Sequence, residues 1–593
     1  MKSRQRAEKN PKGVFMTVKL AETAGFCMGV KRAVDMVLDI AQRKGKERVY
    51  TYGPLIHNPQ TVEILRERGI IPIRNIDEIN LADSNATIII RAHGISPQER
   101  KKIKDRGIKI IDATCPKVTH VQAIIKKHAS RDYTIVIIGD GDHPEVDGLL
   151  GYAGARGIVV NKKSDVENLP LLDKVCVVAQ TTQNKDELND IVCGIRQKYP
   201  ETVVFDTICN STEKRQAEVK QLAAEMDAMF IIGGKNSANT RRLAKISEIQ
   251  GKPTFHIETS EELNQIPLNA YDRIGVSAGA STPNWIIDRV VDGITAGQSD
   301  KRHNIKWVFR FWIFMVKTDI YSSIGAGCLA LASMLLQKLP VNILNIITAS
   351  FYVYAMHTLN RLINRKSSTI IGSFREESYR KHEKVYITMA VLSMALALTC
   401  SLLVGVHVFI LLFLVSGFGI LYNMRIIPRK FHFASFKDLP ASKNISMALA
   451  WAVVASVLPR IENGFSVTFS LLVSFIFTFG VVFVRSAMSD ILDLQSDRLL
   501  GRETIPVLIG KEATQRLLMG ILILLGLLLV VAHPLGMTST LSYALLASVF
   551  FVWIYFKLYD RRAAFSGVVL EGILETNYIL TGLCAVLWLI FIG

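Results

Sequence analysis

The stretch IKIIDATCPKVTHV, residues 108–121, decides the fold of the first half of this chain. Apolar residues run into a short acidic turn, then comes Cys115, and then apolar residues follow at helical spacing. This pattern predicts a strand, a tight turn and a helix, with a thiol at the turn. The same pattern surrounds Cys27 and Cys209, about 90 residues before and after Cys115. A pattern that returns at a fixed period indicates an internal repeat.

Two further strand–turn–helix phrases follow each cysteine, so the repeat has three units of about 90 residues. The phrase VYTYGPLIHNPQTVEIL, for example, has counterparts in YTIVIIGDGDHPEVDGLL and AMFIIGGKNSANTRRLA. Polar residues follow these strands, namely His57, His93, His143, Glu145, Thr181, Thr182, Ser237, Asn239 and Ser281. We therefore predict an α/β pseudo-threefold trefoil, in which side chains beyond the carboxyl ends of parallel strands converge on one axis.

The composition divides the chain into a polar half and an apolar half. The 593 residues have a mean hydropathy of +0.27 and are 49% hydrophobic, but the long apolar runs begin only near residue 318. We predict a basic N-terminal extension (1–16), an α/β domain (17–298), a basic interfacial linker (299–317) and a membrane domain (318–593). The start MKSRQRAEKNPKGVF has no apolar run and does not resemble a secretory signal, which predicts a first half in the reducing cytoplasm.

Three cysteines at equivalent turns suit a metal centre with thiolate ligands, because helix N-termini favour thiolates. Cys27, Cys115 and Cys209 would leave one position of a four-coordinate site open. The candidates are a zinc ion and a cubane [4Fe–4S] cluster with one iron lacking a protein ligand. The zinc alternative predicts a hydrolase with Glu145 as its base. The other five cysteines are expected in the apolar core or in membrane segments.

Side chains that can donate hydrogen bonds, neutral or cationic, lie at the turns after the predicted strands and predict an anion pocket suited to a diphosphate. They are His57, His93, Ser237, Asn239 and Ser281, with glycine-rich turns beside them. Glu145 is the acid at an inner turn that has no evident capping role, and with Thr181 it would form a general acid with a hydroxyl relay. No GxGxxG phrase opens a helix, so a separate carrier must bring the electrons for any redox reaction.

Eight motifs, in order, carry a family resemblance: GFCMGVKRA, HNPQTVE, RAHGIS, DATCPKVT, DHPEVDG, AQTTQN, NSANTRRL and SAGASTP. Residues 17–298 closely resemble the 4-hydroxy-3-methylbut-2-enyl diphosphate reductases, which catalyse the last step of the non-mevalonate isoprenoid pathway. The resemblance implies a [4Fe–4S] cluster on Cys27, Cys115 and Cys209, whose open iron binds the allylic hydroxyl. Two electrons and two protons then remove this oxygen as water, which gives isopentenyl and dimethylallyl diphosphates. Reduced ferredoxin or flavodoxin would supply the electrons.

The resemblance also implies roles for single residues. Glu145 would be the proton donor, Thr181 would orient the substrate alcohol, and His143 would lie close to cluster and substrate. The diphosphate clamp would consist of His57, His93, Ser237, Asn239 and Ser281. One departure is Ala238, where the family often has serine. A side-chain hydrogen bond to phosphate would then be missing, and we expect weaker substrate binding rather than lost chemistry.

Nine apolar segments follow the first half, which predicts an all-α membrane domain of about nine transmembrane helices. They cover residues 318–338, 341–363, 385–405, 407–423, 444–459, 468–487, 516–533, 541–557 and 572–592. Basic residues gather in every second connection, as around Lys384, Lys443 and Lys557. By the positive-inside rule, these loops and the first half lie on the cytoplasmic side of the inner membrane. The loops account for much of the +18 net charge, so we expect a lipid bilayer and not nucleic acid as the partner.

The stretch RSAMSDILDLQSDRLLGRE carries three acids at helical spacing. Asp490, Asp493 and Asp497 would lie on one face of a helix, an arrangement that can hold Mg²⁺ against a diphosphate. The stretch resembles the second aspartate motif of the UbiA-type intramembrane prenyltransferases, whose nine-helix layout also fits.

The first aspartate motif of that family would fall at LNRLINRKS. Asn360 keeps its asparagine, Arg361 replaces an aspartate, and the remaining positions carry the neutral residues Asn364 and Ser368. Two interpretations stay open for the membrane half: a diverged prenyltransferase that uses isoprenoid made from the reductase product, and an inactive anchor for the reductase. A third reading of the chain is a non-enzymatic membrane scaffold with a metal-stabilised soluble domain.

Overall fold

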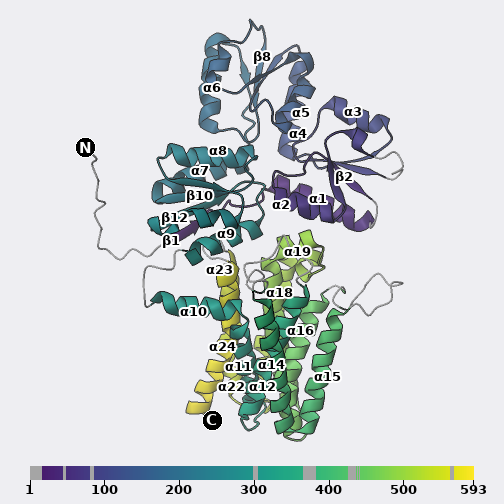
Figure 1. Cartoon of the computed structure of the whole chain (residues 1–593), viewed down its shortest axis with the longest axis vertical. Coiled ribbons are helices and arrows are strands. Elements are labelled where there is room, and N and C mark those ends of the chain that lie inside the picture. The colour runs from purple at the N-terminus through teal and green to yellow at the C-terminus, as the bar shows by residue number, and fades with distance from the viewer. Residues whose placement is uncertain are drawn as a thin grey trace, which may run out of the picture. The chain divides into compact units, whose positions relative to one another are not determined.

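The computed structural model describes residues 17–44, 48–79, 86–297, 305–364, 379, 382–424, 436, 439, 441–560 and 567–592. The chain forms two compact units, Met1–Lys301 and Arg302–Gly593 (Figure 1). The predicted N-terminal extension, Ser368 and most of the basic residues of the predicted cytoplasmic loops lie outside the described residues.

The first unit contains three four-stranded sheets whose neighbouring strands are all parallel. Their orders are β3-β2-β4-β5, β7-β6-β8-β9 and β1-β12-β10-β11. The strands span Thr17–Leu20 (β1), Val49–Tyr52 (β2), Ile70–Ile73 (β3), Thr87–Ile90 (β4), Lys109–Asp112 (β5), Thr134–Ile138 (β6), Gly157–Val160 (β7), Val175–Ala179 (β8), Val203–Val204 (β9), Ala228–Ile232 (β10), Thr254–Ile257 (β11) and Arg273–Ala278 (β12). The strands β4, β8 and β10 are buried at every residue, which explains their continuous apolar sequences.

Helices cover both faces of these sheets. They are Met28–Lys44 (α1), Pro59–Glu67 (α2), Pro97–Asp105 (α3), Pro116–Ala129 (α4), Pro144–Ala153 (α5), Lys185–Lys198 (α6), Asn210–Glu225 (α7), Ala238–Ile249 (α8) and Asn284–Gly297 (α9). Around β6 and β8, for example, α6 packs on one face and α4 with α5 on the other, each over its own apolar cluster (Figure 1). The parallel sheets and helical layers confirm an α/β first half.

The sequence repeat and the observed sheets are offset by one strand. The strand before Cys115, β5, pairs with β4, and the strand before Cys209, β9, pairs with β8. The strand before Cys27, β1, pairs with β12, which is more than 250 residues away in the chain. Each cysteine therefore follows a strand of the preceding sheet, and the N-terminal strand completes the last sheet. This arrangement links the ends of the first unit through backbone hydrogen bonds.

The prediction of three strands per repeat is incomplete, because each sheet has a fourth strand, namely β3, β7 or β11. These strands lead into short 3₁₀ turns and not into the polar turns that we searched for. In each turn a carboxylate, from Glu78, Asp165 or Glu262, accepts two backbone N–H groups at 2.8–3.1 Å. An apolar run followed by such an acidic cap is the sequence signal that identifies the missed strand.

Among the residues that the structure describes, all regular secondary structure of the second unit is helical. Its elements are Ile305–Lys317 (α10), Ile320–Leu336 (α11), Ile343–Asn364 (α12), Glu383–Val404 (α14), Val406–Asn423 (α15), Ser442–Ala452 (α16), the π-helix Val453–Val457, Leu458–Glu462 (α17), Phe469–Leu492 (α18), Leu494–Leu500 (α19), Ile505–Ile509 (α20), Lys511–Ala532 (α21), Leu541–Ala544 (α22), Leu546–Asp560 (α23) and Gly567–Phe591 (α24). Helices occupy each of the nine predicted apolar segments.

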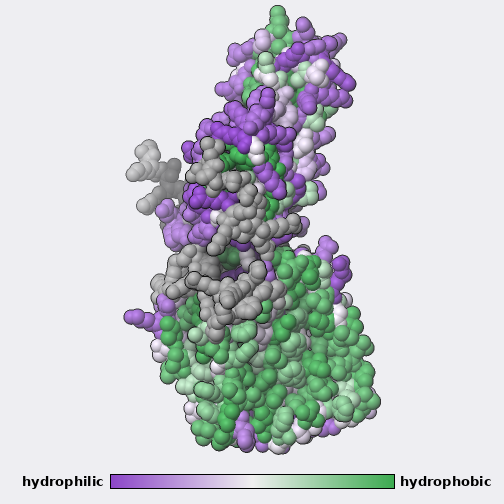
Figure 2. Space-filling model, turned by 90° about the vertical axis from the view of Figure 1, so that its right-hand side faces the viewer, coloured by the Kyte–Doolittle hydropathy of each residue, from purple (hydrophilic) through white to green (hydrophobic). Residues whose placement is uncertain are grey.

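Several of these helices suit a membrane. Among the described residues, five helices are long and apolar enough to cross one, or six if the pair Trp307–Lys317 and Ile320–Leu336, bent by 80°, counts as one span. Two shorter apolar helices are Val406–Tyr422 and Leu541–Lys557. Hydrophobic side chains cover much of the visible surface of this unit, as Figure 2 shows. An apolar exterior of this extent, on helices that satisfy their own backbone, indicates a multi-pass membrane domain, and the count of nine spans stays a prediction.

Candidate active site

The three predicted cysteine ligands lie at the first turns of three helices. Cys27, Cys115 and Cys209 directly precede α1, α4 and α7. Each backbone N–H of these cysteines donates to a carbonyl in the loop after a neighbouring strand, namely that of Ala280, Ala92 and Thr181, at 3.1, 2.9 and 2.9 Å. One repeated backbone contact therefore positions all three thiols.

The three thiols lie close together. A Cβ atom on Gly29 would lie 2.6 Å from Sγ of Cys115 and 4.0 Å from Sγ of Cys27, so this position between the thiols requires glycine. Burial raises the pKa of the Cys115 thiol, backbone N–H groups at the start of α4 lower it, and the charges of Cys27 and Cys209 raise it. Three thiolates that repel one another need a cationic partner, which fits a metal ion or an iron–sulfur cluster.

Sequence reasoning missed a buried cation beside the thiols. Arg215, on α7, is 2% exposed and donates to the carbonyls of Ala278 and Gly25 at 2.6 and 3.0 Å. Its guanidinium interacts electrostatically with both Cys27 and Cys209. A cation at this place suits sulfur ligands that carry negative charge when a metal is bound.

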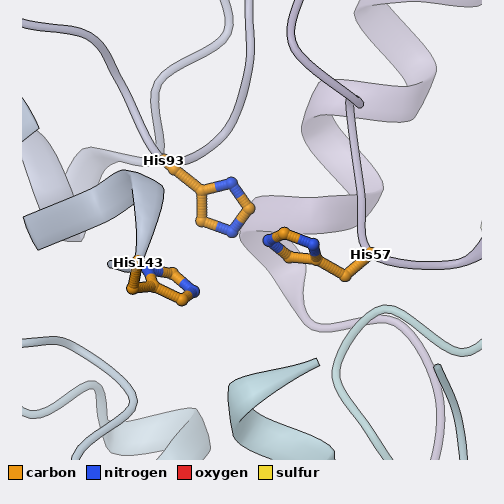
Figure 3. A group of neighbouring side chains, drawn as sticks. All are labelled: His57, His93 and His143. Atoms are coloured by element: carbon orange, nitrogen blue, oxygen red, sulfur yellow. The ribbon is translucent and has the colours of Figure 1, made fainter. Parts of the chain in front are cut away.

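Three histidines form the second part of the site (Figure 3). His57 lies just before α2, His93 follows β4, and His143 directly precedes α5. The ring centroids are 4.8 Å apart for His57 and His93, 5.7 Å for His57 and His143, and 5.3 Å for His93 and His143. The fold thus brings together side chains from the loops of two different sheets, around a common space.

Burial keeps these imidazoles neutral. It lowers the pKa of His57, takes the pKa of His93 well below its ordinary value, and lowers the pKa of His143 to about 3. The guanidinium of Arg91 adds to the effect at all three rings. Burial disfavours charge of either sign, but the positive charge of Arg91 acts on all three rings and favours an anion near them.

A hydrogen bond at the start of α5 indicates whether His143 acts as a metal ligand or as a hydrogen-bond donor. The backbone N–H of Glu145 donates to Nδ1 of His143 at 3.1 Å. Because Nδ1 accepts, a neutral His143 carries its proton on Nε2. An N–H group can donate to an oxyanion but has no lone pair for a metal ion. Although ligand atoms of the three histidines lie within 4.8 Å of one another, this tautomer favours an anion at this place.

Glu145 and Thr181 form the third part of the site. The backbone N–H of Thr181 donates to Oε1 of Glu145 at 2.7 Å, and its hydroxyl donates to Oε2 at 2.9 Å. Glu145 is 2% exposed. Burial raises the pKa of this carboxyl, and the hydrogen bonds from Thr181 and the charge of Arg242 lower it. A carboxyl whose neutral form is favoured by burial is suited to deliver a proton.

The N-terminus of α8 adds buried donors. Ser237 directly precedes the helix, and its hydroxyl accepts from the backbone N–H of Thr240 at 3.4 Å. Asn239 is 6% exposed, and neither polar atom of its side chain has a hydrogen-bond partner among the described residues. The same holds for Nε2 of His57 and Nδ1 of His93. Since buried polar atoms are rarely left unpaired, these four atoms mark the place of a polar ligand.

Two further predicted residues flank these donors. Ser281 lies half-buried in the loop between β12 and α9, next to Ala280, whose carbonyl anchors Cys27. Ala238 is the first residue of α8 and is 4% exposed. A methyl group therefore stands at the start of the helix, where a hydroxyl would add another donor.

Sequence reasoning also missed a bridge across the site. Arg242, on α8, donates from Nη2 to Asp140 at 2.8 Å and from Nη1 to Thr182 at 3.2 Å. Asp140 and Thr182 lie in loops of another sheet, and the side chains of Arg242 and Asp140 are 11% and 23% exposed. The bridge connects α8 and its donors to the loop that leads into α5, the helix of Glu145, and to the loop that carries Thr181. The sequence signal for this bridge was a pair of opposite charges, Asp140 and Arg242, in two equivalent phrases of the repeat.

The predicted aspartate site of the second unit differs from the expected geometry. Asp490 belongs to α18, which ends at Leu492, Asp493 lies at the junction, and Asp497 belongs to α19. Asp490 and Asp497 are buried, whereas Asp493 is exposed. The expectation of one regular helix with three acids on one face is therefore corrected, because the helix is interrupted at Asp493.

The fold and the first site define an α/β protein in which three clustered thiols adjoin buried polar groups suited to an anion. Residues 18–295 match the family described as LytB protein, and residues 320–567 match the UbiA prenyltransferase family. The chain belongs to the LytB family of 4-hydroxy-3-methylbut-2-enyl diphosphate reductases, with a UbiA-family domain fused behind the reductase domain. Both resemblances that the sequence motifs carried are thereby confirmed.

The relatives cover the first half of the chain. The 4-hydroxy-3-methylbut-2-enyl diphosphate reductase of Geobacter sp. (strain M21) is 44% identical over 286 residues, which are 48% of this chain and 99% of the relative. That of Aquifex aeolicus (strain VF5) is 45% identical over 279 residues, which are 46% of this chain and 95% of the relative.

Solved structures resemble each half. A (E)-4-hydroxy-3-methyl-but-2-enyl diphosphate reductase, described as the terminal enzyme of the non-mevalonate pathway, is 44% identical with a TM-score of 0.37 and covers 47% of this chain and 99% of its own. A UbiA homologue from Archaeoglobus fulgidus bound to GPP and Mg²⁺ is 15% identical with a TM-score of 0.33 and covers 46% of this chain and 99% of its own.

Proposed function

We propose that the first unit reduces (E)-4-hydroxy-3-methylbut-2-enyl diphosphate to isopentenyl diphosphate and dimethylallyl diphosphate; its relatives are named 4-hydroxy-3-methylbut-2-enyl diphosphate reductases. The observation that carries the proposal is the set of buried polar atoms left without partners, which lies beside His143 and, through it, the Glu145–Thr181 pair. A diphosphate ester with an allylic hydroxyl has an anionic end for the donors and a hydroxyl end for the acid.

The thiol set suits an iron–sulfur cluster. Cys27, Cys115 and Cys209 are the residues that would hold a [4Fe–4S] cluster, with one iron free of protein ligands. When bound, this group would relay two electrons one at a time from an external carrier and would supply a Lewis-acidic iron. Arg215 offsets part of the negative charge of the bound thiolates. Reduced ferredoxin or flavodoxin is the proposed electron source.

The anionic end of the substrate binds to neutral donors. His57, His93, His143, Ser237, Asn239 and Ser281 are the proposed clamp. A bound diphosphate can accept hydrogen bonds from Nδ2 of Asn239, and from Nε2 of His57 and Nδ1 of His93 when these nitrogens carry the proton, which gives partners to atoms that the free protein leaves unpaired. The added negative charge raises the pKa of the surrounding imidazoles, so binding also favours their protonation.

Glu145 delivers a proton at the hydroxyl end. The reaction breaks one C–O bond, uses two electrons and two protons, and releases water. We assign one of these protons to the Glu145 carboxyl and the orientation of the substrate alcohol to the Thr181 hydroxyl, which lies 2.9 Å from Oε2 of Glu145. Closed packing around Glu145 keeps bulk water away from the transferred proton.

Anaerobic purification of the full-length protein in detergent tests this proposal. Iron and sulfide analysis should give about four irons per chain, and the visible spectrum should show a broad band at about 400 nm, as a thiolate-bound cubane does. Dithionite-reduced protein should then convert the hydroxymethylbutenyl diphosphate to both products. Bound zinc without iron, after anaerobic reconstitution as well, would overturn the reductase and favour the hydrolase.

For the second unit we propose a position in the inner membrane, with the reductase on the cytoplasmic side. The basic connections that mark the cytoplasmic loops in the sequence support this orientation. Protease treatment of sealed inverted vesicles should digest the first unit, and treatment of sealed spheroplasts should leave it intact. Digestion from the outside only would reverse the orientation.

Acidification is expected to destabilise the first unit. Since burial lowers the pKa of His57, His93 and His143, the folded protein binds fewer protons than the unfolded chain below the ordinary histidine pKa of about 6.5. The stability that these groups contribute is complete above that pH and is lost as the pH falls toward the folded values, by about 1.4 kcal/mol per pH unit for each histidine. Urea unfolding at a series of pH values, followed by hydrogen exchange in β4 and β8, measures the loss.

The His143→Gln variant should show a shallower dependence on pH, because one of the buried imidazoles is gone. His120, which is exposed on α4, provides the matched control, and His120→Gln should behave as the wild type. A stability that stays constant below the ordinary histidine pKa would contradict the neutral state of the cluster.

Breaking the Arg242 bridge should weaken catalysis without loss of the cluster. Arg242→Ala frees α8 from the Asp140 and Thr182 loops, so the donors and Glu145 lose their relative position, and kcat/KM should fall roughly 10- to 100-fold. Steady-state assays with dithionite, together with iron analysis, separate the two effects. Arg242→Lys should retain part of the activity, because it keeps the charge opposite Asp140.

A second pair on the same helix gives the control. Lys245 bonds to Glu187 of α6 at 2.7 Å, but both side chains are well exposed, at 62% and 41%. Exposed pairs contribute little, so Lys245→Ala should leave both kcat and KM unchanged. Equal kinetics for Arg242→Ala and the wild type would show that the bridge has no positioning role.

A further inference from the structure

Arg91 is a cation at the histidine cluster to which the proposed reaction assigns no role. It directly follows β4, and its backbone carbonyl accepts from the N–H of Gly94 at 3.0 Å, which closes a turn over residues 91–94. His93 belongs to this turn, and the carbonyl of Ala92 accepts from the backbone N–H of Cys115 at 2.9 Å. One turn therefore positions Arg91 together with a histidine of the pocket and a predicted cysteine ligand.

The guanidinium of Arg91 packs against the loop that carries His57. A Cβ atom on Gly53 would lie 2.2 Å from Nη1 and 3.0 Å from Cζ of Arg91, so glycine at this position leaves room for the guanidinium. Gly53 also has a φ of +74°, a conformation that favours glycine. Because Gly53 follows β2 and Arg91 follows β4, the guanidinium lies between the loops of His57 and His93.

Arg91 has no bonded counter-ion. Among the described residues, no hydrogen bond or ion pair engages its guanidinium, and the Nε atom is buried. Asp147 and the Tyr52 hydroxyl act on it electrostatically, but Asp147 is exposed on α5 and the Tyr52 hydroxyl donates to Glu99. A charge that is partly removed from water without a bonded partner is unfavourable. The position therefore favours an anion that a ligand supplies.

The charge of Arg91 reaches the whole histidine cluster (Figure 3). Burial has the larger effect, and the guanidinium lowers the pKa of His57, His93 and His143 further. The principal charges at these rings come from arginines and from the neighbouring imidazoles, and none of them comes from an acid. The space among the rings thus has a positive potential, although the imidazoles themselves are neutral.

Two arginines of α8 also act on parts of the cluster. Arg242 acts on one ring and bonds to Asp140 at 2.8 Å, and Arg241 acts on two rings and is exposed. Arg91, in contrast, acts on all three rings, is partly buried and has no bonded acid. Among these three cations, Arg91 is therefore the one best placed to be neutralised by a bound anion.

Neutral donors alone do not select a ligand by its charge. Imidazole, hydroxyl and amide groups donate to a neutral alcohol as well as to a phosphate oxygen. A fixed positive charge adds an attraction that grows with the negative charge of the ligand. A diphosphate ester carries several negative charges, so it gains from Arg91 where a phosphate-free alcohol does not.

We infer that Arg91 is a further residue of the diphosphate site, whose positive charge holds the diphosphate beside His57 and His93. The inference rests on the proposed function, because it takes the diphosphate ester as the ligand. Arg91 acts through its charge, whereas the imidazoles and Asn239 donate the hydrogen bonds.

Steady-state kinetics of the full-length holoprotein in detergent give the first test. In Arg91→Met, which has a side chain of similar length without charge, the KM for the hydroxymethylbutenyl diphosphate should rise roughly 10- to 100-fold. The change in kcat should be much smaller, and the iron content should stay the same, because Glu145, Thr181 and the thiols are untouched. Arg91→Lys keeps the charge and should recover part of the affinity. A fall in kcat with an unchanged KM would overturn the inference.

Arg66 gives the matched control on α2, the helix that follows His57. Its side chain is 57% exposed and pairs with Glu63 at 3.2 Å. Exposed pairs contribute little, so Arg66→Met should keep the wild-type KM. A KM that rises equally in Arg66→Met and Arg91→Met would overturn a specific effect of Arg91.

Calorimetric titration with inorganic diphosphate in EDTA measures binding without turnover. The wild type should bind this probe, and Arg91→Met should lose affinity by a similar factor. Identical isotherms for the two proteins would overturn the inference, even where the wild type converts the substrate. A wild type that binds inorganic diphosphate through Arg91 but does not convert the substrate would support the inference and overturn the reductase proposal.

Asp147→Asn provides a variant with the opposite expected sign, since Arg91→Met can also disturb the packing on Gly53. The substitution removes an exposed acid that partly neutralises Arg91, so the KM and the dissociation constant of inorganic diphosphate should fall a few-fold. The double variant with Arg91→Met should lose this gain. A higher KM in Asp147→Asn, or a gain that persists in the double variant, would overturn the inference.

Discussion

Replacing Cys115 with alanine is expected to abolish the reduction of the hydroxymethylbutenyl diphosphate. The proposed cluster needs three thiolates, and the Cys115 thiol lies close enough to Cys27 and Cys209 to interact with both, with Gly29 packed against its sulfur. Two thiolates leave two irons without protein ligands, so the cluster is lost on purification and iron falls from about four per chain to near zero. Iron analysis, the visible spectrum and a dithionite assay under anaerobic conditions measure the effect.

Cys193→Ala is the matched control: the expectation of a core position for Cys193 is wrong, because this residue is exposed on α6, away from the helix N-termini that carry the three clustered thiols. It should keep full iron content and full activity. Hydrogen exchange in β4 and β8 should show that Cys115→Ala still folds. A Cys115→Ala protein with unchanged iron and turnover would exclude the three-cysteine centre.

Replacing Glu145 with glutamine is expected to lower kcat by about 10²- to 10⁴-fold, the range that a positioned general acid contributes. Glutamine fills the same volume and its amide oxygen can still accept the backbone N–H of Thr181, but it cannot release a proton. The KM should change little, because the diphosphate donors are untouched. Steady-state kinetics and iron analysis together distinguish lost proton transfer from a lost cluster.

The pH dependence of the wild type gives a further readout of the same group. Burial raises the pKa of Glu145, and only the protonated carboxyl can donate. Activity should therefore fall as the pH rises through this raised pKa, and Glu145→Gln should lack that limb of the profile. Glu187, an exposed acid on α6 that bonds to Lys245, is the control, and Glu187→Gln should keep the wild-type kcat. Full activity of Glu145→Gln would remove this carboxyl from the mechanism.

The two halves of the chain illustrate different limits of sequence reasoning. In the first half, the motifs around the cysteines and histidines identified the family, and the loops that carry them are close in space. In the second half, the spacing of Asp490, Asp493 and Asp497 suggested a continuous helix with a metal site. The observed partners of Asp490 are Lys443 and Asn444, which lie 47 and 46 residues away in the chain. Spacing within one helix carries no information about a cation that another helix supplies.

The missed elements have a similar cause. The strands β3, β7 and β11 lead into acidic caps and not into polar turns, so a search for strand–turn–helix phrases passed over them. The sheet to which β1 belongs was also hidden, because β1 pairs with β12 at the opposite end of the unit. Local patterns predict that a strand exists, whereas its neighbours depend on the packing of the whole unit.

The amino-acid sequence by itself determined the α/β character of the first half, the apolar helices of the second, the family of each, and the positions of Cys27, Cys115 and Cys209. These properties follow from local periodicity and from short motifs, in which the interacting residues are close in the chain. Only the tertiary structure decided which remote groups meet. Arg242 pairs with Asp140 across 102 residues and Arg361 with Asp319 across 42. The reason is physical: a buried charge is stable only beside a partner, and the folded packing alone selects which distant charge lies within reach.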